Sequence, residues 1–413
     1  MALSSRRGGK HKAEWDSDVY AYKNLAILLT IPVMVLAKLI VAYGLPPKYF
    51  YDNNRILGMV TGGGTMQAWE GSYRVASDLF TSLDVFHFQT MLDWSLTLGV
   101  IGTGLLMLFM LRMPQIDLLQ MLFYLASVGL LNIYVFNIGK DVIQFTFFLA
   151  AFIVLLLPID KVIVKIALIA GILWYESTFF RSYYVLIAAL FIGVYVVLTV
   201  FRKLTDSFSA LTGIAIIVTL FVMVYVMMLV VERVMPDEYR QVLTVRGAQT
   251  QGREDGTDSV TVILNLLPGS GLPGFMWNYV LNALRMMFPV ELALKGVYYL
   301  PFFVFQALVA FYVVNLLRSI NSIRDETDVL ALCVYVGYAL ASFIFEPDFG
   351  SWVRHEAATF PILHLLIFSK NQQLSVIFAS LKRVDQGRVN RGAKSAGKER
   401  SAKEYSVKEA RKR

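Results

Sequence analysis

The chain has 413 residues, of which 57% are hydrophobic and only 16% carry a charge, and its mean hydropathy is +0.58. A soluble protein would carry about 25% charged residues, so this composition excludes an ordinary soluble globular protein. The net charge of +8 comes from the two terminal segments and does not indicate nucleic-acid binding, and the single cysteine, Cys333, excludes a disulfide framework and a cysteine-based metal site.

The apolar residues are gathered in runs that approach the roughly 20 residues a helix needs to cross a bilayer. The sequence therefore predicts an all-α, polytopic helical membrane protein with about ten transmembrane helices. The fourth, fifth and tenth runs are the shortest. In chain order the predicted spans lie at 24–44, 91–112, 116–137, 142–158, 162–176, 183–201, 209–231, 298–317, 329–345 and 357–369.

Lysine and arginine set the predicted orientation, because cytoplasmic flanks carry an excess of both. The segments 1–23 and 370–413 are basic, so both ends of the transmembrane domain 24–369 are expected in the cytoplasm. The charged tail has few apolar residues, which predicts disorder along the anionic inner leaflet.

This orientation leaves three larger outer segments, at about 45–90, 232–297 and 346–356. The second contains apolar positions at helical spacing from Asn278 to Phe288, interrupted by Pro289. This spacing predicts a helix that lies in the membrane interface or re-enters the membrane.

The third outer segment is the densest group of ionisable residues between two apolar runs. It contains Glu346, Asp348, Arg354, His355 and Glu356. Ionisable groups are costly beside a bilayer, so such a cluster indicates a functional site. A histidine with carboxylates close by has the partners that a proton-transfer group needs.

Four outer cations stand where the charge rule disfavours them: Lys140, Arg181, Arg285 and Arg354. A phosphate near the membrane surface, either a lipid phosphate or a pyrophosphate, would stabilise them through charge-assisted hydrogen bonds. Simpler explanations stay open. Lys140 could pair with the neighbouring Asp141, Arg181 could reach the interface along its aliphatic stem, and Arg285 could lie on the polar face of an amphipathic helix.

Aromatic residues also occur in the outer segments, and they include Trp277 and Trp352. An aromatic face suits the apolar C–H face of a sugar ring, although anchoring at the interface explains each residue equally well.

Four short motifs follow one another along the chain. They are Lys140-Asp141, Phe180-Arg181-Ser182-Tyr183-Tyr184, Asn282–Pro289, and Glu346-Pro347-Asp348 followed by Gly350 and Arg354-His355. The order of these motifs resembles that of a known family, the Wzy/EpsG-type polysaccharide polymerases of bacterial capsule, O-antigen and exopolysaccharide pathways.

The resemblance implies a GT-C-like membrane glycosyltransferase in the bacterial cytoplasmic membrane, with its active site on the outer face. It would take a glycan repeat unit from undecaprenyl pyrophosphate and join it to a second lipid-linked unit. The implied partners are this donor and acceptor, membrane lipid, and chain-length regulator and flippase proteins, with no nucleic acid. No cofactor is implied, because several cations could stabilise the pyrophosphate leaving group without a metal.

The resemblance also implies roles for the candidate residues. Arg181, Arg285, Arg354 and Lys140 would bind the pyrophosphate. The general base would be His355 or one of the three nearby carboxylates. Contacts to the glycan would come from Asp52, Arg55, Trp277 and Trp352.

Three alternatives remain at this point. A transferase that uses a polyprenyl monophosphate sugar would rely on an acidic residue of the first outer segment, often with a metal. An O-antigen-type ligase would differ only in its acceptor. A flippase or transporter would place charges in the middle of the membrane and show repeat symmetry, whereas here the charges gather at one face.

Overall fold

The computed structural model describes residues 6–62, 70–113, 115–205, 209–237, 239–240, 261–267, 271–346, 348–369, 372–374 and 376–377. The chain divides into two compact units, Met1–Phe368 and Ser369–Arg413. Apart from residues 372–374 and 376–377, the predicted disordered tail 370–413 lies outside the described residues. The fold below is that of the first unit.

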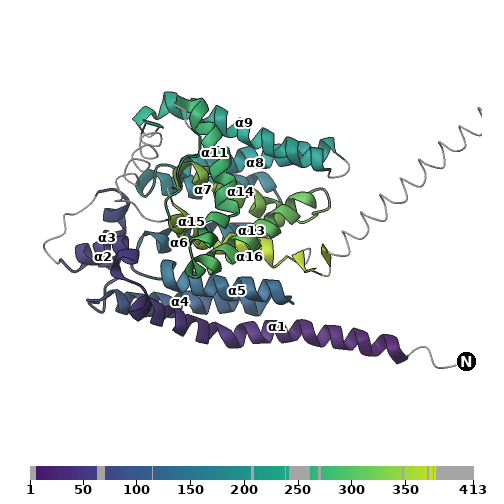
Figure 1. The fold of residues 1–413 in the computed structure, drawn as a ribbon, viewed down its shortest axis with the longest axis horizontal. Coiled ribbons are helices and arrows are strands. Elements are labelled where there is room, and N and C mark those ends of the chain that lie inside the picture. Colours follow the sequence, from purple (N-terminus) through teal and green to yellow (C-terminus); the bar gives the residue numbers. More distant parts are fainter. Residues whose placement is uncertain are drawn as a thin grey trace, which may run out of the picture. The chain divides into compact units, whose positions relative to one another are not determined.

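Within the described part of the chain the regular elements are all helices, which confirms the all-α prediction (Figure 1). Eight of them are long and apolar enough to cross a membrane, which supports a polytopic membrane protein. The first span continues from α1 into a π-helical turn η1 (Ile40–Gly44), and the third continues from α5 into η3 (Leu131–Val135). The eight helices are α1 (Arg6–Leu39), α4 (Met91–Arg112), α5 (Leu118–Leu130), α7 (Val162–Phe179), α8 (Tyr184–Leu204), α9 (Ala210–Val234), α13 (Leu300–Arg318) and α14 (Glu326–Phe345).

The other two predicted spans take a different form. The run 142–158 is α6 (Lys140–Leu156), an apolar helix of 17 residues. The run 357–369 holds only the end of α15 (Phe349–Ala358) and the eight-residue α16 (Phe360–Ile367). Thr359 separates these two helices, and Pro361 follows in the first turn of α16, where its missing N–H costs no intrahelical hydrogen bond.

Helix α14 forms the centre of the first unit and is buried along almost its whole length. It packs closely on α8, and the contact depends on Gly337. A Cβ atom there would come within 2.7 Å of the backbone nitrogen of Phe191. Small residues allow helix backbones in membranes to approach in this way.

Two short helices between the first two spans, α2 (Tyr51–Val60) and α3 (Ser72–Leu83), pack beside α4 and α6. Their apolar faces form a second, smaller core with Trp94 of α4 and Ile143 of α6. This packing brings α2 next to the first turn of α6, where the Lys-Asp pair lies.

The helix predicted in the second outer segment is present as α11 (Gly271–Met287), and Pro289 separates it from α12 (Val290–Leu294) and the short η4 (Val297–Tyr299). One face of α11 is buried in the protein. Tyr279 packs there and donates a hydrogen bond from its hydroxyl to the carbonyl oxygen of Leu340 in α14, at 2.9 Å. A 3-10 turn η2 (Pro47–Phe50) leads into α2.

Candidate functional site

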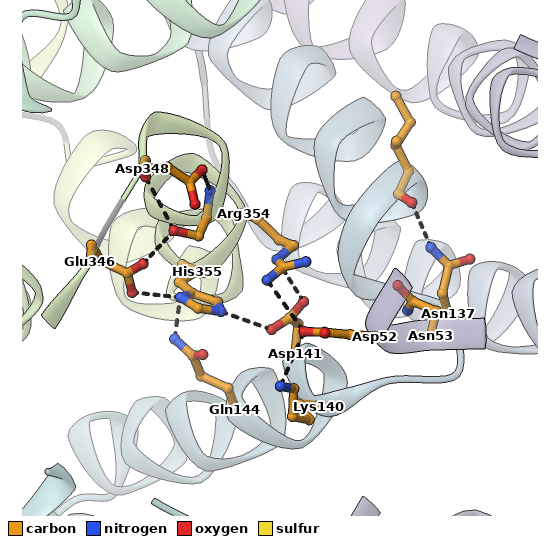
Figure 2. Close-up of polar contacts among 12 residues, drawn as sticks. Asp52, Asn53, Asn137, Lys140, Asp141, Gln144, Glu346, Asp348, Arg354 and His355 are labelled. Carbon is orange, nitrogen blue, oxygen red and sulfur yellow. Dashed lines mark hydrogen bonds and ion pairs between the residues drawn. The ribbon is translucent and has the colours of Figure 1, made fainter. Parts of the chain in front are cut away.

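One polar cluster joins five parts of the chain that are far apart in sequence. Figure 2 shows its side chains from α2, from α6, from the end of α14 and from α15. Helix α15 supplies Arg354 and His355, the end of α14 supplies Glu346, and α2 supplies Asp52. The first turns of α6 supply three side chains, and the turn before α8 supplies two. These are Lys140, Asp141 and Gln144, and Arg181 and Tyr183.

The start of α15 is fixed by Asp348, the N-cap residue of the helix. Its Oδ1 accepts a hydrogen bond from the backbone N–H of Ser351 at 2.8 Å. The backbone N–H of Phe349 donates to the carbonyl oxygen of Thr261, which lies between α9 and α11 in the chain and so brings that connection against this end of α15. Asp348, predicted as a candidate base, therefore has the capping role typical of aspartate at this position.

His355 lies between two carboxylates. Its Nδ1 is 2.6 Å from Oε1 of Glu346, and its Nε2 is 3.2 Å from Oδ1 of Asp141. The second oxygen of Glu346 accepts a hydrogen bond from the Ser351 hydroxyl at 2.7 Å. Burial alone would lower the pKa of His355, but the two carboxylates outweigh burial and raise this pKa above its usual value. Each ring nitrogen therefore faces a carboxylate, an arrangement that favours the imidazolium form, and an imidazolium suits proton donation and anion binding better than general-base catalysis.

Arg354 bridges the two aspartates of the cluster. Its Nε is 3.1 Å from Oδ2 of Asp141, and one terminal nitrogen is 3.8 Å from Oδ2 of Asp52. The Asp141 side chain is only 8% exposed, whereas those of Arg354 and Asp52 are 20% and 23% exposed. The Arg354–Asp52 side of the cluster is therefore the more open side.

Lys140 extends the cluster toward α3. Its Nζ is 3.1 Å from Oδ2 of Asp52 and lies 3.7 Å from the centre of the Tyr73 ring, a cation–π contact. The Tyr73 hydroxyl donates a hydrogen bond to Oδ1 of Asp52 at 2.6 Å. Burial would raise the pKa of Asp52, but Lys140, Tyr73 and Arg354 together hold this pKa below its usual value.

Arg181 completes the cluster from the turn before α8. One terminal nitrogen is 4.0 Å from Oδ1 of Asp141, and the other donates to the Tyr183 hydroxyl at 2.8 Å and to Oε1 of Gln144 at 3.2 Å. The Gln144 amide in turn donates to the backbone carbonyl oxygen of His355 at 3.1 Å. The cluster thus brings four cationic side chains and three carboxylates into one continuous network.

Two of the predicted site residues take part in other contacts. Arg285 donates to Oε2 of Glu291 at 2.6 Å and to the carbonyl oxygen of Leu264, also at 2.6 Å. Arg55 donates to the Tyr51 hydroxyl at 2.9 Å. None of these three hydrogen bonds reaches the cluster.

Glu356 and Trp352 belong to a separate, buried network between α15, α13 and α14. Glu356 accepts hydrogen bonds from the Tyr335 hydroxyl and from the Gln306 amide. The indole N–H of Trp352 donates to Oε1 of Gln306 at 3.1 Å. Burial raises the pKa of Glu356 to about 8, which favours the neutral acid at neutral pH. Trp352 is fully buried and offers no open face to a sugar, whereas the Trp277 side chain is 66% exposed.

Several residues of the cluster were not among the predicted site residues. Asp141, Gln144, Tyr73 and Tyr183 were missed in this way. Asp141 could have been predicted from the sequence. It directly follows Lys140 in the first turn of a helix, so both side chains lie at the same end of the bundle. Among the described residues, no three His, Cys, Asp or Glu side chains are arranged to hold a metal ion.

Comparisons with protein-family models, with curated proteins and with solved structures returned no match to this chain.

Proposed function

We propose that this protein is a polysaccharide polymerase that joins undecaprenyl-pyrophosphate-linked oligosaccharide repeat units on the outer face of the bacterial cytoplasmic membrane. The observation that carries the proposal is the convergence of Lys140, Arg181, Arg354 and His355 from separate elements at the ends of apolar helices. In this proposal the two termini lie in the cytoplasm, as the distribution of Lys and Arg favours.

The reaction needs stabilisation of a leaving pyrophosphate. The oxygen of the acceptor hydroxyl bonds to the anomeric carbon of the donor sugar, and the bond from that carbon to the pyrophosphate oxygen breaks. The departing oxygen keeps the electron pair, and fixed cations stabilise its charge. Arg354 and Lys140 border the more exposed Asp52, so a phosphate oxygen can take the place of that carboxylate.

The proton of the acceptor hydroxyl must go to a base. His355 is disfavoured for this role, because the two carboxylates beside it raise its pKa and so favour the protonated ring, which has no free nitrogen to accept a proton. We therefore assign the base to a carboxylate of the cluster, and His355 to holding Asp141 and Glu346 in place while it adds positive charge beside the leaving group.

A second candidate is a transferase that uses a polyprenyl monophosphate sugar. The position of Asp52 favours it, because this acidic residue of the first outer segment lies inside the cluster, 3.1 Å from Lys140. The two candidates differ in the donor, so the donor preference of the purified protein separates them.

The experiment uses purified protein, a synthetic undecaprenyl-pyrophosphate oligosaccharide and EDTA. The polymerase proposal expects a ladder of longer lipid-linked glycans. The Arg354→Ala variant should lose the ladder. Arg74→Ala should keep it, because the Arg74 side chain is 64% exposed and its ion pairs among the described residues are with Glu70 and Asp78, its near neighbours in the sequence. A normal ladder from Arg354→Ala would refute the assignment. Sugar transfer from a monophosphate donor with added metal would favour the second candidate, and transport of intact lipid-linked glycan across vesicles would indicate a flippase.

A further inference from the structure

A lysine lies buried inside the first candidate span, outside the two basic terminal segments. Lys38 of α1 is only 5% exposed and belongs to the apolar stretch Ala21–Gly44. A charge buried at such a position is costly, so residues of this kind are retained where they serve a defined interaction.

The Lys38 ammonium has backbone partners. Its Nζ donates to the carbonyl oxygen of Asn132 at 2.7 Å and to that of Phe136 at 2.9 Å. Both carbonyls lie at the end of η3, where the last carbonyl groups of a helix lack partners within the helix and carry its negative pole. None of the ion pairs among the described residues includes Lys38, so the helix end itself compensates the charge.

Helix α4 leaves room for this lysine at Gly99. A Cβ atom there would come within 2.3 Å of Cε and 2.9 Å of Nζ of Lys38. The glycine therefore lets the side chain pass between α1 and α4 to reach the end of η3.

One of the two carbonyls that Lys38 binds, that of Phe136, is the first in the turn Phe136–Gly139, which leads directly into Lys140 and Asp141. Helix α2 holds the same turn from another direction, because the amide of Asn53 donates to the carbonyl oxygen of Ile138 at 2.6 Å. A Cβ atom on Gly139 would lie 2.7 Å from this amide. Within the turn, the amide of Asn137 bonds back to η3 (Figure 2).

We propose that Lys38 is a positioning residue of the candidate site, which fixes the turn Phe136–Gly139 and thereby the placement of Lys140 and Asp141. Lys38 touches none of the cluster side chains in the contacts described above, so it acts through the backbone that carries two of them. Its expected effect on catalysis rests on the proposed function, but its effect on the turn does not.

The Lys38→Met variant removes the ammonium and keeps an unbranched apolar side chain of similar length. Misplacing a reacting group by about 1 Å can cost about 100-fold in rate, so we expect kcat to fall by about 10- to 100-fold. The KM for the lipid-linked donor should change much less, because Arg181 and Arg354 come from other elements and still bind the phosphates. Lys38→Arg should recover part of kcat, because a guanidinium can also donate to two carbonyls.

If Lys38 served only to stabilise the fold, the melting temperature of Lys38→Met would fall together with its activity. A positioning role predicts little change in the melting temperature. Replacing a buried charge by an apolar residue of similar volume is often neutral or stabilising, so the melting temperature of Lys38→Met should stay within about 3 °C of the wild type. Amide hydrogen exchange in peptides covering residues 136–141 should become faster, because the end of the helix loses two of its bonds.

The matched control is Lys23, on the same helix. Its Nζ also bonds backbone carbonyls, those of Leu111 and Met113 at the end of α4. Lys23→Met should leave both kcat and the exchange of residues 136–141 unchanged.

The measurements use the full chain in lipid nanodiscs. Faster exchange at 136–141 and lower kcat at an unchanged melting temperature, with recovery in Lys38→Arg, would support the proposal. Unchanged exchange at 136–141, or a melting temperature that falls in step with activity, would overturn it. If the wild type makes no polymer while Lys38→Met still speeds exchange at 136–141, the proposed function fails and the positioning of the turn stands.

Discussion

Replacing Asp141 by asparagine tests how strongly the cluster holds the first unit together. Asp141 is the shared partner of Arg354 at 3.1 Å, His355 at 3.2 Å and Arg181 at 4.0 Å, and its side chain is 8% exposed. Asparagine keeps the shape and removes the charge. Removing one partner of a buried ion pair costs about 3–5 kcal/mol.

We expect the lower end of this range, about 3 kcal/mol, because the cations keep other partners. Arg354 still reaches Asp52 at 3.8 Å, and His355 still has Glu346 at 2.6 Å. The free energy of unfolding can be measured with SDS in mixed micelles, followed by the fluorescence of the six tryptophans.

The control for this measurement is Asp78→Asn. The Asp78 side chain is 74% exposed and lies 3.9 Å from Arg74, and exposed pairs of this kind contribute little. If Asp141→Asn unfolds at the same SDS fraction as Asp78→Asn, the cluster does not stabilise the fold, and the argument from buried, shared charges is refuted.

Three further predictions concern packing and pH. Gly337→Ala should destabilise the protein by about 1–3 kcal/mol, because the new methyl group would clash with the backbone of α8. Its control is Gly171→Ala, whose methyl group would meet no atom within 4 Å. This control should be neutral or stabilising in the same unfolding assay. Glu356→Gln should flatten the pH dependence of stability, because a buried acid whose pKa is raised from 4.5 to about 8 makes the wild type lose stability as pH rises through that window. His355 is a base whose pKa is raised by the carboxylates of Glu346 and Asp141. Its contribution to the free energy of unfolding is therefore complete below about pH 6.5 and is lost as pH rises through the pKa of the folded state. The stability difference between wild type and His355→Gln should therefore shrink from pH 6 to pH 9, and a constant difference would contradict this assignment.

Hydropathy predicted the spans well where the apolar run is long and uninterrupted. It failed at 357–369, where a run apolar enough for a span contains Thr359 and Pro361 and forms two short helices. Composition alone does not show such a break, because the apolar residues continue on both sides of it. The run 142–158 was predicted as a span and forms a helix, but this helix has 17 residues and opens with the polar residues of the cluster.

The site was predictable where residues are close in sequence and share a face. On α15, Arg354 and His355 lie three and four positions after Ser351, so all three point to the same side, toward the cluster. Trp352 and Glu356 are also four positions apart, and they form the opposite pair, which points into α13 and α14. The segment 346–356 was predicted as a single site because the order of charged residues along a sequence does not show which face of the helix each of them occupies.

Contacts across the bundle were harder to foresee. Nothing in the sequence near Asp52 indicates that α2 packs beside α6, since the contact depends on the small apolar core that α2 and α3 share with Trp94 and Ile143. The same packing brings Tyr73 over Lys140. Asp52 was predicted at the glycan, whereas its described partners are the two cations Lys140 and Arg354 and the Tyr73 hydroxyl.

This pairing changes how the cations must work. Lys140, Arg181 and Arg354 were chosen as residues that need an anion, yet each already lies within 4.0 Å of a carboxylate of the protein. A phosphate therefore binds with a net gain in free energy only if its interactions with these cations are stronger than those of the carboxylate that it displaces. Two phosphate groups carry more charge and more acceptor oxygens than one aspartate, and Asp52, the most exposed of the three carboxylates, is the one that such a ligand can displace at the least cost. Asp52→Asn should then bind inorganic pyrophosphate more tightly than the wild type, and weaker binding would mean that Asp52 itself contacts the ligand.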